Sequence, residues 1–154
     1  MEPARAANPH DLPVLIELAR ALRAEMIDQR GGALRATREA RPEPIEETLP
    51  SLFGRDDASI IVGTIDDTIV GFGTVEIETL RDGSRLGVIG DLFVEREARA
   101  VGVGESIADL IVEFCTAAGC VGIDAYALPG ARDAKNFFER SGFTARALVM
   151  HHKL

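Results

Sequence analysis

Apolar residues near the start of the chain recur at the three- and four-residue spacing of a helix. They are Leu12, Leu15, Ile16, Ala19, Leu22 and Met26. This spacing places them on one side of an amphipathic helix, which would be buried against a core. Asn8 and Asp11 precede the stripe and offer side-chain oxygens that can cap its first turn. Gly31 and Gly32 follow and end the helix. We also expect a short strand before it, at residues 4–7.

Beyond this helix, a polar stretch gives way to apolar runs that are typical of strands. The polar residues up to position 44 predict a loop, and residues 45–53 predict a short helix. Three runs rich in apolar residues follow, at residues 59–65, 69–80 and 85–94. An Asp-Asp pair and an Asp-Gly pair separate the runs and supply turn residues. This order predicts a meander of three strands.

Helical spacing returns in the second half of the chain. Ile107, Leu110, Ile111 and Phe114 share one face of a helix that we expect at residues 104–118. We then expect a strand at residues 121–127, a helix that ends at a Gly-Phe pair, and a last strand at residues 144–154. Elements in this order predict the α/β (α+β) class, with a mixed, largely antiparallel central sheet flanked by helices. A chain of 154 residues fits one domain, residues 1–154.

Charge and composition narrow the range of partners. The chain has 25 acidic and 17 basic residues, and its net charge of −8 argues against nucleic acid or an anionic membrane as the main partner. The sequence holds no apolar run of about 18 residues or more, and no basic start followed by an apolar core. We therefore expect a cytoplasmic protein that does not enter a membrane.

The stretch between the third run and the following helix has the residues of a phosphate-binding loop. Arg99, Gly102 and Gly104 lie between an expected strand and an expected helix. Glycines allow close approach of the backbone, and the first amides of a helix point at one spot and carry partial positive charge. The same residues would also suit an ordinary turn, with Arg99 as a solvated loop residue.

With two further segments, this loop resembles the GNAT superfamily of acyl-CoA-dependent N-acetyltransferases. The matching segments are Asp91-Leu-Phe-Val-Glu95, Arg99-x-x-Gly102-x-Gly104, and Ala134-Lys-Asn-Phe-Phe-Glu-Arg-Ser-Gly142-Phe143. The resemblance implies a GNAT-like sheet, acetyl-CoA as co-substrate, and acetyl transfer to a primary amine of a small molecule or peptide by direct attack in a ternary complex. The residues implied to bind acetyl-CoA are Phe93, Val94, Arg99, Ala100, Val101, Gly102, Val103, Gly104, Glu105 and Phe138.

The resemblance also implies which groups act on the acetyl group and the amine. Backbone N–H groups near a strand bulge would stabilise the oxyanion, here those of Phe93 and Val94. Asp91 is the best candidate to accept the ammonium proton or to hold a cationic acceptor, and its alternative role is that of a solvated strand residue. Weaker candidates are Glu25, Glu76 and Glu78. The stretch after Gly90 is similar to that of the polyamine acetyltransferases, which carry Glu-Asp where this chain has Gly90 and Asp91.

The chain departs from the family pattern at two positions. Phe138 stands where the family usually has the Tyr that protonates the departing thiolate, and Ala131 stands where an Asn often holds the pantetheine arm. Tyr126, the only tyrosine, is the candidate replacement acid, and otherwise a half-buried strand residue. These departures keep a second function open, that of a catalytically weak acyl-CoA-binding sensor or interaction module.

Cysteines and histidines do not change this interpretation. Cys115 and Cys120 have no disulfide or metal-site spacing, and we expect them to be buried packing residues. The histidines, His10, His151 and His152, form no metal-binding pattern either. We expect no metal, and the sequence leaves a homodimer open.

Overall fold

One five-stranded sheet forms the centre of the molecule. The computed structural model describes residues 3–154, and the sheet has the order β1-β2-β3-β4-β5. Its strands are β1 (Ala4–Ala6), β2 (Ala58–Ile65), β3 (Thr68–Thr79), β4 (Arg85–Val94) and β5 (Gly122–Asp124). Neighbouring strands are antiparallel except β4 and β5, which are parallel. The predicted fold class, a mixed and largely antiparallel sheet, is therefore confirmed.

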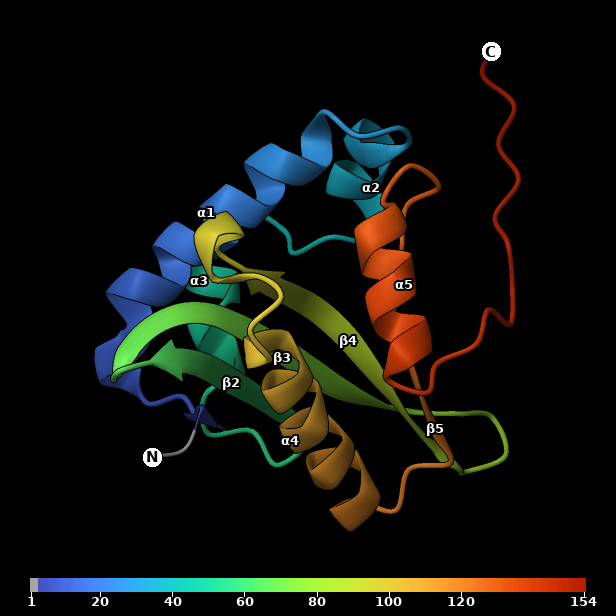
Figure 1. Cartoon of the computed structure of the whole chain (residues 1–154). Coiled ribbons are helices and arrows are strands. Elements are labelled where there is room, and N and C mark those ends of the chain that lie inside the picture. Colours follow the sequence, from blue (N-terminus) through green and yellow to red (C-terminus); the bar gives the residue numbers. More distant parts are fainter. Residues whose placement is uncertain (1–2) are drawn as a thin grey trace.

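Helices cover both faces of this sheet (Figure 1). They are α1 (Leu12–Ile27), α2 (Gly32–Arg38), α3 (Ile45–Thr48), α4 (Val103–Ala117) and α5 (Arg132–Arg140), with short 3-10 turns at Pro9–Asp11, Pro50–Leu52 and Arg96–Ala98. On one face, Leu15 of α1 and Ile45 of α3 pack with Val62 of β2. On the other face, Ile107 of α4 packs with Ile61 of β2. Adjacent strand residues thus point into two separate cores, as the strand period of two requires.

The residues that the sequence indicated as caps lie in the 3-10 turn that leads into α1. The Asn8 side chain accepts a hydrogen bond from the His10 amide at 2.9 Å, and the Asp11 carboxylate accepts one from the Asn8 amide at 2.9 Å. This reciprocal capping belongs to the 3-10 turn Pro9–Asp11, which leads directly into α1, whereas Asp11, the N-cap of α1 itself, makes no side-chain capping hydrogen bond. Arg5 of β1 also binds Asp11 at 2.8 Å, which ties the helix start to the sheet edge.

The expected loop before residue 44 contains a helix, so that prediction is wrong for α2. Gly31 turns the chain with a φ of 79°, and α2 starts at Gly32. A Cβ on Gly32 would lie 1.8 Å from the Met26 carbonyl oxygen, so the two helices approach each other too closely for a side chain. Ala36 is buried in the same region. The contact uses small residues, which give no apolar stripe in the sequence. The short helix expected at residues 45–53 is present as α3 and a 3-10 turn.

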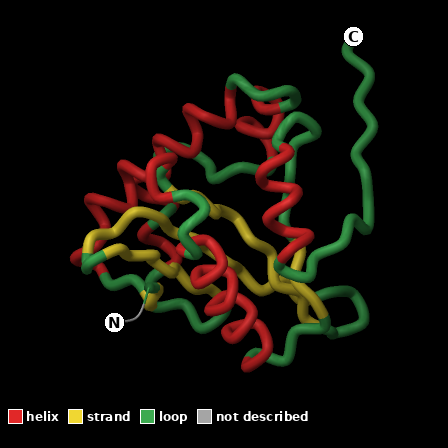
Figure 2. The backbone as a smooth tube through the Cα atoms, viewed as in Figure 1, coloured by secondary structure: helices red, strands yellow, loops and turns green. Residues whose placement is uncertain are grey.

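The expected last strand is absent among the described residues. Residues 144–154 form no helix or strand and run away from the body as an extended segment (Figures 1 and 2). Leu148, Val149 and Met150 are 84%, 78% and 87% exposed. The prediction rested on composition, but a strand also needs a neighbouring backbone edge with which to pair. Among the described residues, β5 forms an edge of the sheet and its Asp124 binds Arg146, but residues 144–154 do not pair with that edge.

The strand expected at residues 121–127 is also shorter, because β5 ends at Asp124.

Of the two cysteines, Cys115 is buried in α4 and both thiols are free. Burial raises the pKa of the Cys115 thiol to about 11, helped by the neighbouring Cys120. Residues 3–154 hold no group of three or more metal-binding side chains. Within the same span, no helix combines the length and the apolar content that crossing a bilayer requires.

Candidate functional site

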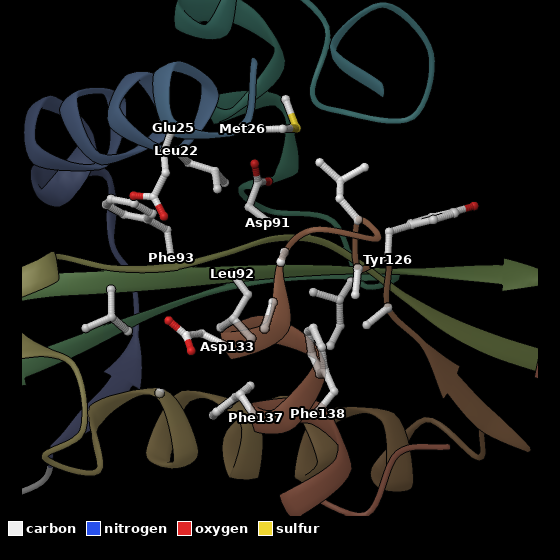
Figure 3. Close-up of a pocket in the computed structure, with 18 of the residues that line it drawn as sticks. Leu22, Glu25, Met26, Asp91, Leu92, Phe93, Tyr126, Asp133, Phe137 and Phe138 are labelled. Atoms are coloured by element: carbon white, nitrogen blue, oxygen red, sulfur yellow. The ribbon is translucent and has the colours of Figure 1, made fainter. Parts of the chain in front are cut away.

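The candidate site is the space that opens where β4 and β5 part. The two parallel strands pair only at Leu86–Gly122, Gly87–Ile123 and Val88–Asp124. Beyond these pairs, the rest of β4 has no partner on its β5 side, and a cavity of about 690 Å³ lies there. Its walls come from α1, the end of β4, the loop before α4, residues 125–134 and α5 (Figure 3). The shortness of β5 thus creates the site.

Backbone geometry at the start of α4 leaves room for a ligand. Ala100 and Gly102 have positive φ values of 66° and 91°, and Gly102 caps the helix. The first backbone amide that makes a helical hydrogen bond is that of Ser106, which donates to the Gly102 carbonyl at 3.1 Å. The preceding amides of the first turn therefore lie outside the helical ladder. A Cβ on Gly102 would meet nothing within 4 Å, whereas one on Gly104 would lie 3.1 Å from the ring of Phe137.

Arg99 makes hydrogen bonds and an ion pair within the fold instead of extending into solvent. Its Nε donates to the Val94 carbonyl at 2.8 Å, and its Nη2 binds the Glu25 carboxylate at 2.9 Å. The guanidinium also lies 5.4 Å from the centre of the Phe93 ring. Arg99 therefore joins the loop to the end of β4 and to α1. Because Glu25 is engaged in this pair, it is a poor candidate for a proton acceptor.

Asp91 is buried, 5% exposed, and held by two residues from other elements. Arg41 donates to its Oδ2 through Nε at 2.9 Å and through Nη2 at 2.6 Å. The Thr74 hydroxyl of β3 donates to the same oxygen at 2.6 Å. Arg41 also donates to the Thr48 carbonyl at 3.2 Å, so the pair links β4 to the segment around α3. Asp91 is thus neither on an outward face nor free to hold a cationic acceptor with that oxygen.

A bulge in β4 lies next to Asp91, earlier than the predicted oxyanion donors. Thr74 pairs with Asp91 and Val75 pairs with Ile89, so Gly90 is the extra residue. The Glu95 amide donates to the Val70 carbonyl of β3 at 2.8 Å. Since successive residues of a strand alternate, the Phe93 amide also faces β3, and the Val94 amide faces the open side. Of the two predicted donors, only Val94 can reach the cavity through its amide.

The other predicted residues divide by position. Asp91, Phe93, Val94, Arg99, Ala100, Gly104, Glu105, Tyr126 and Phe138 line the cavity. Val101 and Gly102 are exposed, and the Val103 side chain is buried in the core beneath, so these three could contribute only backbone groups or outer contacts. Glu76 and Glu78 lie on β3 outside this lining, where Arg55 binds Glu76 at 3.1 Å.

Phe138 and Tyr126, the two aromatic residues considered for the role of general acid, have different surroundings. The Phe138 ring is half-buried, 5.2 Å from the ring of Phe143 and 5.4 Å from that of Phe137. Tyr126 is 48% exposed, and Figure 3 shows its hydroxyl at the outer end of the ring, away from Asp91 and Phe138. Tyr126 thus lines the cavity with its ring, and its hydroxyl points away from the space near Phe138.

Sequence reasoning missed Arg35 and Arg41, which both line the cavity. The Arg35 side chain of α2 is half-buried, and its Nε is buried without a hydrogen-bond partner. The Tyr126 ring lies 5.7 Å from its guanidinium. Burial lowers the pKa of this guanidinium, while the charges of Glu39, Asp91 and Tyr126 act in the opposite direction. Both arginines come from a polar stretch that holds several arginines, and the sequence does not show which of them face the cavity.

Comparisons with known proteins agree with this arrangement. The sequence profile of the acetyltransferase (GNAT) family matches residues 20–143. No curated protein matches the chain. Among solved structures, glucosamine-6-phosphate N-acetyltransferase from Arabidopsis thaliana is 22% identical, with a TM-score of 0.68, over 97% of this chain and 96% of that one.

Two other solved structures show how widely this fold is used. An aminoglycoside acetyltransferase from an uncultured soil metagenomic sample is 21% identical, with a TM-score of 0.70, over 98% of this chain and 93% of that one. A transcriptional regulator from Bacillus halodurans is 22% identical, with a TM-score of 0.71, over 98% of each chain. At these identities the likeness concerns the fold, and the chemistry must be argued from the site.

Proposed function

Because the chain belongs to the acetyltransferase (GNAT) family, we propose that it transfers an acetyl group from acetyl-CoA to a primary amine. The amine belongs to a small molecule or a peptide and attacks directly in a ternary complex. The observation that carries the proposal is the combination of a cavity between β4 and α5 with an open helix start at Gly102. A diphosphate needs such converging amides, and an extended acyl arm needs such a slot.

The residues at the start of α4 fit a pyrophosphate. Gly102 leaves space where any side chain would stand, and its positive φ turns the backbone towards that space. The amides of Val103, Gly104 and Glu105 would donate hydrogen bonds, and the partial positive charge of the helix start would favour the anion. Arg99, already fixed by Val94 and Glu25, would hold the loop in shape. Bound acetyl-CoA would supply an activated thioester, whose acetyl carbon gains the amine nitrogen and releases the thiolate.

The chain's own groups would act at three points of this reaction. The Val94 amide faces the open side of β4 and would donate to the oxyanion. Asp91 would position the amine from the floor of the cavity, because Arg41 and Thr74 fix its carboxylate. The thiolate must take up a proton, and the acceptor amine would supply it, because the Tyr126 hydroxyl points away from Asp91 and Phe138.

The experiment that tests the proposal is release of free thiol from acetyl-CoA with a panel of amines. The panel holds polyamines, amino acids, aminoglycosides, amino sugars and peptide N-termini. We expect release above background with at least one class. No release with any class, together with tight acetyl-CoA binding, would favour the acyl-CoA-binding module that Phe138 and Ala131 suggest.

Phe138→Tyr sharpens this choice between enzyme and module. The new hydroxyl would lie on the cavity side of an aromatic cluster, where a general acid typically contributes about 10²–10⁴-fold. If protonation of the thiolate limits the rate, kcat rises. Phe143→Tyr adds the same hydroxyl to the neighbouring ring, outside the cavity lining, and should leave kcat unchanged. Tyr126→Phe lowers kcat only if Tyr126 is the present acid.

A further inference from the structure

Arg35 is the feature of the cavity that the proposed function leaves unexplained. Its guanidinium lines the cavity and is half-buried, yet within residues 3–154 no carboxylate forms an ion pair with it. Its Nε is buried and makes no hydrogen bond. Arginine stays charged at neutral pH even when burial lowers its pKa. A buried donor without a partner costs free energy, and an anion bound in the cavity would remove that cost.

Two carboxylates act on the charge of Arg35, Glu39 and Asp91, and both have other partners. Glu39 lies 3.9 Å from Arg38 Nε. Asp91 gives one carboxylate oxygen to Arg41 and Thr74, and Arg41 is satisfied by this pair. The Tyr126 ring covers one side of the Arg35 guanidinium. None of these neighbours belongs to the loop before α4, so the acceptor end of the cavity is the place that Arg35 serves. The turn before α2 closes this end, because a Cβ on Gly31 would lie 3.6 Å from the Leu128 side chain.

We propose that the acceptor is an amine that also carries an anionic group, a carboxylate or a phosphate, which Arg35 binds. This inference rests on the proposed acetyl transfer and names the substrate class of the same site. A planar guanidinium suits either anion, because its N–H groups can donate in pairs. The inference runs against the polyamine class, since a polyamine would bring further positive charge next to Arg35.

Matched pairs of amines test this inference. An amino acid is compared with its amide, and glucosamine 6-phosphate with glucosamine, so the two sources of negative charge are separated. For at least one pair we expect the anionic member to have at least a tenfold higher kcat/KM. Arg35→Gln should remove that preference by raising KM for the anionic member, and Arg35→Lys should keep part of it.

Arg38→Gln is the matched control. Arg38 lies on the same helix but is exposed and does not line the cavity. Its substitution should leave the preference intact. Equal kcat/KM within both pairs, or a preference that Arg35→Gln does not change, overturns the inference while the acetyl transfer stands. If no amine is acetylated, the proposed function fails, and calorimetric binding of the same pairs to the wild type and to Arg35→Gln decides the role of Arg35.

Discussion

At the scale of single residues, the ion pair of Asp91 and Arg41 is the contact that ties the candidate site to the core. Their side chains are only 4% and 8% exposed. Removing one member of such a pair leaves the other charged and unpaired, which typically costs about 3–5 kcal/mol. The pair therefore contributes to the stability of the fold as well as to the shape of the cavity floor.

Asp91→Asn is expected to destabilise the protein by a few kcal/mol, because Arg41 loses its counter-charge. In a domain of this size, about 1 kcal/mol corresponds to roughly 2–4 °C in Tm, so thermal unfolding measures the effect. At a temperature where the variant is folded, kcat/KM should also fall at least tenfold if Asp91 positions the amine, with acetyl-CoA affinity unchanged. The double variant Asp91→Leu, Arg41→Leu should lose less stability than the single one. Wild-type Tm and rates in Asp91→Asn would contradict both roles.

The same residues show what local sequence patterns cannot contain. Asp91 was predictable as a candidate because it lies on the strand before the glycine loop. Its partner is 50 positions away, in a polar stretch that carries several other arginines. Which arginine reaches the cavity depends on how α2 folds back on α1, and that fold depends on the close approach at Gly32. Arg35 and Arg41 therefore become visible only in the structure.

At the scale of elements, periodicity predicted those that bury a clear apolar face. The expected helices at α1 and α4 and the expected meander of β2, β3 and β4 are all present. The predictions for α2 and for residues 144–154 failed for the same reason. The structure of each segment depends on what it packs against, which its own residue pattern does not show. The small residues of α2 pack on α1, whereas the apolar residues Leu148, Val149 and Met150 lie exposed. The early end of β5 opens the cavity of the candidate site.

At the scale of the whole molecule, the order of elements and the glycine loop were sufficient to predict the fold and the family. The acceptor was not predictable, because the cavity wall that would bind it comes from α1, α2, β4 and residues 125–134 together. The overall charge of the chain was also a poor guide. A net charge of −8 is compatible with a cationic acceptor, yet the cavity lining includes the half-buried Arg35, whose Nε has no hydrogen-bond partner.

The most direct test of the central claim is the acetyl-CoA affinity of Gly102→Val, measured by calorimetry and compared with that of Gly83→Val. Both glycines have positive φ, 91° and 86°, and a Cβ on either meets nothing within 4 Å. The two variants therefore carry the same backbone strain, but Gly83 lies in the turn between β3 and β4. We predict at least a tenfold loss of affinity in Gly102→Val and wild-type affinity in Gly83→Val, with both folded by circular dichroism. Equal affinity in the two variants would contradict the binding of acetyl-CoA at the start of α4.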